Sequence, residues 1–206
     1  DFIADIFGKF LNSTDEERYK FSIREIQTHE VIQEVETAYS DIGIIAIKDC
    51  DEEIMKRYLT NKGVSFTSFL KAAPHVFVHK AHPLAQKERL SFADLKDYPY
   101  VCYEQGEHNS SFFTEEMMDF SHVVKRVMIS DRATLMNMLL VTDAYTVGTG
   151  IMPSALNKGD IVSVPLDSEE YYNIGYLLNR ERKVSDMTDI ILIIIIALFA
   201  VAVTKE

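Results

Sequence analysis

The sequence predicts an α/β protein in which helices and strands alternate along the chain. From residue 2 to residue 79, segments with apolar residues at helical spacing alternate with short apolar runs of strand length. The same alternation returns after residue 100, which indicates a second unit of the same kind. With 206 residues, of which 47% are hydrophobic and 26% charged, the chain is long enough for one large or two small domains.

The first third of the chain contains three predicted helices and four predicted strands. Thr28 is placed to cap the second helix, and Ile54, Met55, Tyr58 and Leu59 form the buried side of the third. The run 42–47 is apolar throughout, as expected of a strand buried on both faces. The elements in order are a helix over 2–10, a strand over 19–26, a helix after Thr28, a strand over 42–47, a helix from Asp51, and strands over 64–70 and 75–79.

The stretch 80–95 reads as a crossover into a second lobe. Pro83 cannot donate a backbone hydrogen bond and therefore ends the preceding strand. Ser91 followed by Asp94 is typical of a capping box, which starts a short helix.

After this crossover the alternation continues to the end of the chain. Ser185 or Asp186 is placed to cap a last helix. The predicted elements are strand 100–104, helix 111–119, strand 122–129, helix 132–141, strand 144–148, strand 161–165 and strand 171–178. We expect the first part of lobe I over 1–79, lobe II over 80–168, and a return to lobe I with a C-terminal helix over 169–206.

Charge and cysteine content limit the function. A net charge of −11 and a pI near 5.0 argue against nucleic-acid binding by this chain alone, since affinity for phosphates requires clustered Lys and Arg. Cys50 and Cys102 lack metal-ligand spacing and favour a reducing cytoplasm. The apolar run 190–203 is shorter than the ~20 residues of a membrane span, so we expect no membrane anchor. Two explanations for it stay open, burial at a subunit contact and an error in the assigned residues.

Five short strings in register resemble one known family. They are HPLA at 82–85, LSFADL, YPYV, ISDRATLMNMLL and YTVGTGIMP. Together they resemble the effector-binding domain of LysR-type transcriptional regulators, over about residues 1–185. The resemblance implies the type 2 periplasmic-binding-protein fold, in which two Rossmann-like lobes joined by crossover strands bind a small-molecule effector between them. It also implies a homodimer or homotetramer in the cytoplasm.

Two parts of that family's pattern are missing from the sequence. We expect binding to DNA only through an N-terminal helix-turn-helix domain that is absent here. We also expect the first strand of the effector domain to be missing, because residues 2–10 are predicted to form the helix that follows it.

Candidate effector contacts lie at helix starts and strand ends, where free N–H groups favour a carboxylate. The alternative reading is structural: Thr28 and Ser130 would only cap helices, and Cys102 would belong to the core. The candidates are Thr28, His29, Cys102, Tyr103, Glu104, Gln105, Arg132, Thr134, Gly148 and Thr149.

No catalytic or metal motif is present in the sequence. His75, His79 and His82 have no third carboxylate or thiolate nearby in the sequence, so we expect no metal site, and no cofactor is indicated. We expect an effector-sensing domain for an amino-acid-like or carboxylate metabolite rather than an enzyme. The alternative is a solute-binding protein of a transporter with the same fold, which an upstream secretory leader would reveal.

Overall fold

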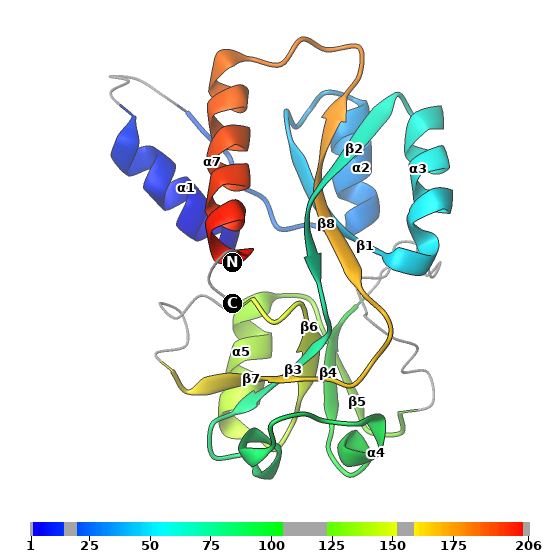
Figure 1. The fold of residues 1–206 in the computed structure, drawn as a ribbon, viewed down its shortest axis with the longest axis vertical. Helices are drawn as coiled ribbons and strands as arrows, with labels where there is room; N and C mark the ends of the chain where they lie inside the picture. The colour runs from blue at the N-terminus through cyan, green and yellow to red at the C-terminus, as the bar shows by residue number, and fades with distance from the viewer. Residues whose placement is uncertain (1, 15–19, 105–122, 152–158, 204–206) are drawn as a thin grey trace. The chain divides into compact units, whose positions relative to one another are not determined.

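A computed structural model of the chain describes residues 2–14, 20–104, 123–151 and 159–203 (Figure 1). The helices are α1 (Phe2–Ser13), α2 (Thr28–Glu36), α3 (Glu52–Asn61), α4 (Phe92–Leu95), α5 (Arg132–Val141) and α7 (Asp186–Val203), with 3₁₀ turns η1 (Asp49–Asp51) and η2 (Pro83–Gln86). The strands are β1 (Gly43–Lys48), β2 (Val64–Ala72), β3 (His75–His79), β4 (Tyr100–Tyr103), β5 (Arg126–Ile129), β6 (Thr146–Gly148), β7 (Ile161–Pro165) and β8 (Tyr172–Asn179). The helix predicted over 111–119 lies outside the described residues.

The chain divides into two compact units. Unit 1 comprises residues 1–45, 53–70 and 174–206, and unit 2 comprises residues 46–52 and 71–173. The chain therefore passes between the units at four places, after residues 45, 52, 70 and 173.

A three-stranded sheet with the order β1-β8-β2 forms the centre of unit 1. Ile32 and Val35 of α2, and Met55 and Leu59 of α3, are buried. Gly175 lies in the central strand, where a Cβ atom would come within 2.3 Å of the Phe66 ring. Glycine at this position lets β8 pack closely beside β2.

The strand predicted over 19–26 is wrong for its described part, because residues 20–27 form neither helix nor strand. A strand requires a hydrogen-bonding neighbour, and the sheet of unit 1 consists of β1, β8 and β2. The aromatic ring of Phe21 instead packs edge-on against Phe7 and Phe10 of α1, with centroids 5.2 and 5.4 Å apart. Packing against α1 therefore accounts for Phe21, whereas Ile23 of the same pattern is 56% exposed.

The apolar face predicted for α3 is too wide. Met55 and Leu59 are buried as predicted, whereas Ile54 is 50% and Tyr58 37% exposed. Residues four apart lie on one line along a helix, and this narrow line alone faces the sheet.

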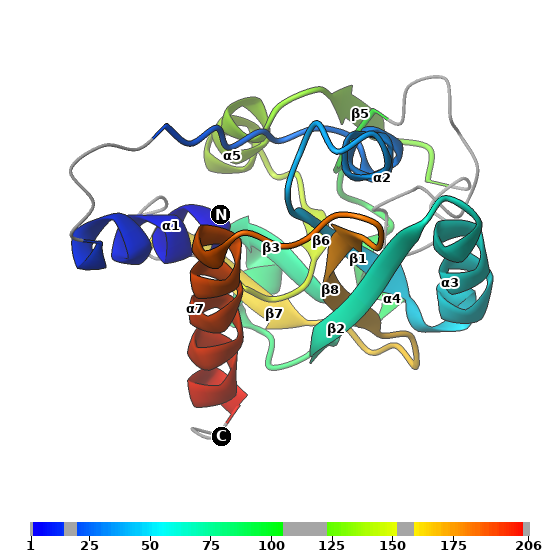
Figure 2. The same cartoon turned by 90° about the horizontal axis from the view of Figure 1, so that it is seen from above.

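The last helix, α7, packs against α1 in unit 1 (Figure 2). Ser185 caps it, since its Oγ accepts a hydrogen bond of 3.1 Å from the Thr188 N–H. This confirms one of the two predicted caps. In the described part of the chain, no helix combines the length and the apolar character that crossing a membrane requires.

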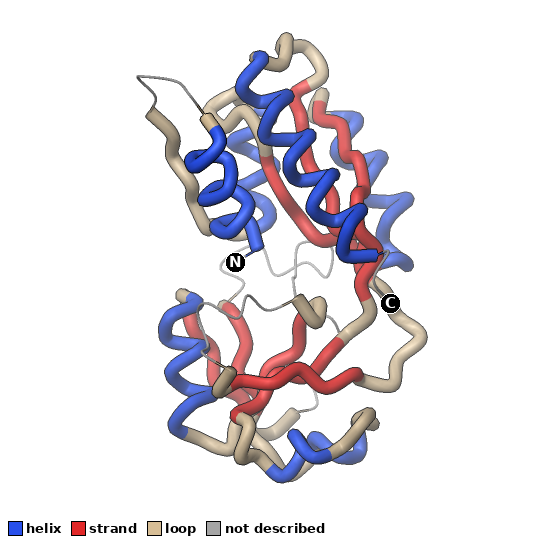
Figure 3. The backbone as a smooth tube through the Cα atoms, turned by 60° about the vertical axis from the view of Figure 1, so that its left-hand side comes forward, coloured by secondary structure: helices blue, strands red, loops and turns tan. Residues whose placement is uncertain are grey.

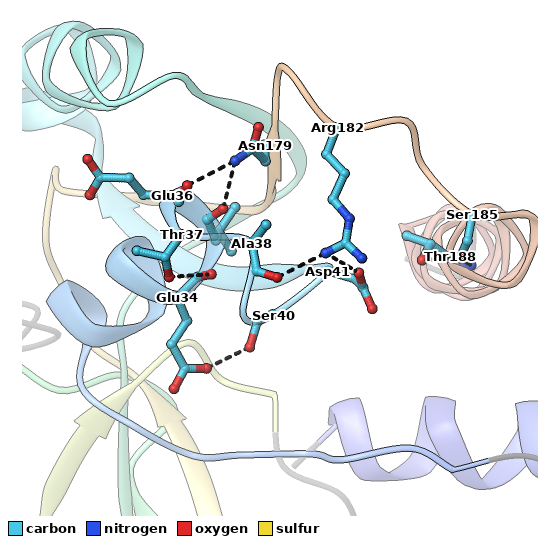
Figure 4. Close-up of polar contacts among 11 residues, drawn as sticks. Glu34, Glu36, Thr37, Ala38, Ser40, Asp41, Asn179, Arg182, Ser185 and Thr188 are labelled. Atoms are coloured by element: carbon cyan, nitrogen blue, oxygen red, sulfur yellow. Dashed lines mark hydrogen bonds and ion pairs between the residues drawn. The ribbon is translucent and has the colours of Figure 1, made fainter.

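Polar side chains at the end of β8 and just after it close the C-terminal end of α2 (Figure 4). The Asn179 side-chain amide donates to the Val35 and Glu36 carbonyls at 3.2 and 3.0 Å. Arg182 donates to the Ala38 carbonyl at 3.0 Å and pairs with Asp41 at 2.9 Å. The Asn179 amide thus bonds two carbonyls of the last helical turn, Arg182 bonds the turn that follows, and the arginine charge suits the negative end of the helix dipole.

Unit 2 contains a sheet with a hydrophobic core on each face. Val76 and Val78 of β3 belong to one core with Leu84 and Leu95, while Phe77 belongs to the other with Leu135 and Leu139 of α5. Side chains of a strand point alternately to the two faces, so a short strand supplies both cores. The result is a sheet sandwiched between α5 and the segment that contains η2 and α4 (Figure 3).

Backbone hydrogen bonds join the strands of unit 2. β3 pairs antiparallel with β6 and β7, and β4 pairs parallel with β5. Tyr145 connects these two groups of strands through a parallel bridge to Tyr100. The Val101 N–H donates to the Tyr145 carbonyl at 2.8 Å, and the Tyr145 N–H donates to the Pro99 carbonyl at 2.9 Å.

The predicted crossover after β3 depends on His82, which is 2% exposed. Its Nδ1 accepts a bond of 3.0 Å from the Leu84 N–H and must therefore carry no proton. Its Nε2 then donates to the Asp143 carbonyl at 3.2 Å. One neutral imidazole thus caps η2 and ties it to the segment before β6. The capping box of Ser91 and Asp94 is confirmed, and the Lys87 ammonium together with Ser91 lowers the pKa of Asp94 to about 2.

We predict that Gly175→Ala lowers the free energy of unfolding by about 2–3 kcal/mol, because the new methyl group would overpack the core. It would also meet the Thr67 carbonyl, a backbone atom that cannot rotate away. Gly8→Ala in α1 is the matched control, since a Cβ atom added at Gly8 would meet no atom within 4 Å and the helix gains stability. Urea denaturation measures both, and equal stability of the two variants would contradict this packing.

We predict that His82→Ala lowers the free energy of unfolding by about 2–4 kcal/mol, since it leaves a cavity and two backbone groups without partners. His82→Asn should lose only about half as much, because its side-chain oxygen still accepts from the Leu84 N–H. Urea denaturation at neutral pH measures the difference. Equal losses for both variants would show that the cap contributes nothing.

Candidate functional site

The described site residues of unit 2 gather at one edge of its sheet. β4 runs parallel to β5, and the bridge between Tyr100 and Tyr145 is also parallel. The carboxyl ends of β4, β5 and β6 therefore lie at the same edge, which is where open α/β sheets bind ligands. The Glu104 N–H donates to the Ile129 carbonyl at 2.8 Å and holds two of these strand ends together.

Thr149 follows β6 in a turn that packs tightly on β3. A Cβ atom at Gly148 would lie 2.7 Å from the Phe77 ring, and one at Gly150 would lie 2.6 Å from the His75 ring. Gly150 also has a φ of 78°, which favours glycine. The two glycines thus fix the position of Thr149, which is partly exposed.

Asp131 caps the start of α5, and the suggestion that Ser130 caps this helix is wrong. The Asp131 carboxylate accepts from the Thr134 N–H at 2.9 Å and from the Thr134 hydroxyl at 2.7 Å. These bonds, the hydroxyl first, hold the pKa of Asp131 below its usual value. The sequence did not lead us to predict Asp131 as the cap of this helix. An acidic residue three positions before a threonine at a helix start is nevertheless a recognisable capping pattern.

Arg132 is the first residue of α5, beside this cap. Thr134 is exposed at the same helix end. Its hydroxyl hydrogen is engaged by Asp131, so towards a ligand this hydroxyl acts as an acceptor.

Thr28 is the first residue of α2 in unit 1 and is 4% exposed. It does not cap the helix as predicted, because the cap position belongs to Gln27, whose N–H donates to the Glu30 side chain at 3.0 Å. His29, the next residue, is half-buried. These two candidates belong to unit 1, whereas the other described candidates belong to unit 2.

Cys102 lies in β4 and is 3% exposed, within one of the cores of unit 2. Its Sγ lies 3.1 Å from the Arg126 Nε and 3.7 Å from the Val127 carbonyl oxygen. These are contacts to the neighbouring strand β5, whereas Tyr103 and Glu104 follow at the strand end. Gln105 lies outside the described residues.

The three histidines near the crossover serve the fold. His75 Nδ1 donates to the Ala73 carbonyl at 3.0 Å, and His79 Nδ1 accepts from the Ala81 N–H at 3.2 Å. Among the residues that the structure describes, no group of three or more His, Cys, Asp or Glu side chains is arranged to hold a metal ion.

Two solved structures with the same fold are effector-binding domains of other proteins. The BenM effector binding domain with its effector benzoate superposes with a TM-score of 0.66 at 16% identity, over 100% of this chain and 89% of that one. The effector binding domain of QuiR in complex with shikimate gives a TM-score of 0.64 at 13% identity, over 96% and 90% of the two chains.

The chain spans about two thirds of the length of some longer relatives. HinK, a LysR family transcriptional regulator from Pseudomonas aeruginosa, matches with a TM-score of 0.65 at 11% identity, over 95% of this chain and 65% of that one. No curated protein matches the sequence significantly.

The sequence itself decides the family. The family described as LysR substrate binding domain matches residues 15–189, which is most of the chain. The chain therefore belongs to the LysR substrate-binding domain family and has the type 2 periplasmic-binding-protein fold of that family.

Proposed function

We propose that this chain is the effector-sensing domain of a LysR-type transcriptional regulator and binds an amino-acid-like or carboxylate metabolite. The observation that carries the proposal is the convergence of three parallel strand ends with the start of α5 in unit 2. Family membership supports the same reading, as do the small acids bound by two neighbours, shikimate and benzoate.

The residues at this edge divide into donors and acceptors. Thr149 and the strand-end backbone groups offer donors to a carboxylate, and Arg132 is the candidate countercharge. Asp131 already occupies the Thr134 N–H at the start of α5, so a ligand carboxylate binds beside this helix end rather than on it. The charged Asp131 and the acceptor oxygen of Thr134 suit an ammonium or hydroxyl group. An amino-acid-like effector provides both kinds of group.

The remaining site residues complete the proposal. The further candidate contacts are Thr28 and His29 of unit 1, Cys102, Tyr103, Glu104 and Gly148 of unit 2, and Gln105, which lies outside the described residues. The effector favours one arrangement of the domain, and this preference of about 1–3 kcal/mol is passed to a DNA-binding domain. We propose that the complete regulator is a cytoplasmic homodimer or homotetramer.

A thermal-shift screen of amino acids and their des-amino carboxylate analogues tests this function. An effector at 100 times its Kd stabilises the chain by about 2.7 kcal/mol, which corresponds to a rise in Tm of about 5–10 °C. We expect an amino acid to give this rise and its des-amino analogue to give a smaller one. A screen in which no amino acid and no carboxylate raises Tm would reject the proposed ligand class.

Thr149→Val should abolish the effector-induced rise in Tm and leave the unliganded Tm nearly unchanged, because it removes a ligand donor and keeps the side-chain volume. Thr142→Val is the matched control. The Thr142 hydroxyl donates to the Met138 carbonyl at 2.6 Å at the other end of α5, so its loss should lower the unliganded Tm and preserve the rise. The opposite pattern would show that Thr149 is structural.

A further inference from the structure

Three residues at which the chain passes between the units are joined by side-chain contacts inside unit 2. The four crossings follow residues 45, 52, 70 and 173, so Glu52, Lys71 and Asn173 are the unit 2 residues at three of them. The Asn173 side-chain amide donates to Asp49 Oδ1 at 3.2 Å and to Glu52 Oε2 at 2.5 Å. Lys71 Nζ lies 3.5 Å from the same Asp49 oxygen.

Further contacts bring the segment before β8 into this cluster. The Asp49 N–H donates to the Tyr171 carbonyl at 3.0 Å. The Lys71 ammonium lies over the Tyr171 ring, 4.6 Å from its centroid. Asp49, which lies in the 46–52 segment, therefore contacts the other two crossing segments through its backbone and its side chain.

The chemistry of the cluster requires an amide at position 173. The carboxylates of Asp49 and Glu52 both lie close to the Asn173 amide nitrogen, and each needs a hydrogen-bond donor. The amide nitrogen carries two hydrogens, one for each carboxylate, and Lys71 offsets part of the negative charge. Asn173 is 8% exposed, so water does not readily replace these bonds.

We propose that Asn173, Asp49, Glu52 and Lys71 form a crossing clamp, which holds three of the four chain crossings together as one element of unit 2. A displacement of one crossing segment is then shared by the other two. Under the proposed function, on which this consequence rests, the clamp lets an effector bound at the strand ends of unit 2 act on several crossings at once. The contacts of the clamp are all made by residues of this chain.

Amide hydrogen exchange on the whole, unliganded chain at neutral pH tests the clamp. Asn173→Asp keeps the side-chain shape but replaces the two donors with a third carboxylate. We expect exchange to accelerate about tenfold in 46–52, 71–73 and 171–173 together, because these segments open as one unit. Asn179→Asp is the matched control on the same strand. Asn179 caps α2 in unit 1, so this variant should accelerate exchange near 34–40 and leave the three crossing segments unchanged.

The double variant Asn173→Asp with Glu52→Gln decides the case if the single variant unfolds. It exchanges the positions of amide and carboxylate, so the donor returns to the cluster and exchange should slow again in all three segments. Accelerated exchange at 171–173 alone, or no recovery in the double variant, would overturn the clamp. Because no effector is added, such a failure leaves the ligand screen unaffected, and a failed ligand screen leaves the clamp unaffected.

Discussion

The strand pairing at Tyr145 is the constraint on which the site depends. Two backbone hydrogen bonds from this residue join the β4–β5 pair to the strands around β3. Each contributes only about 1 kcal/mol net, but together they align the chain that leads into β6 with the paired strands β4 and β5. Tyr145 is 1% exposed, and burial raises the pKa of its hydroxyl to about 12, so it stays neutral. With the pairing in place, the strand ends and the start of α5 meet at one edge.

The starts of α2 and α5 are closed by side chains of the protein itself. At α5, Asp131 takes the place that an anionic ligand would occupy at an open helix start. At α2, Gln27 and Glu30 form the cap, and the C-terminal carbonyls are bonded by Asn179 and Arg182. Under the proposed function, side chains and strand ends beside the helices recognise the ligand.

The two glycines around Thr149 and the imidazole of His82 help to position the edge of the unit 2 sheet at which we propose that the effector binds. Gly148 and Gly150 allow the turn to press on Phe77 and His75, so Thr149 has little freedom. His82 anchors the segment that leaves β3 to the backbone just before Tyr145. The crossing clamp does the same for the segments that lead to unit 1. Rigid support of this kind reduces the entropy lost when a ligand binds.

Local patterns in the sequence determined most helices, most strands and the family, because hydrophobic periodicity and capping residues act over a few positions. The capping box of Ser91 and Asp94 and the cap at Ser185 follow from such patterns. Tertiary structure alone decided that residues 20–27 form no strand, since pairing depends on a distant neighbour, and that Ile54 and Tyr58 are exposed. It also decided the partners of Asn173, because donors and carboxylates more than 100 residues apart meet only when the chain has folded.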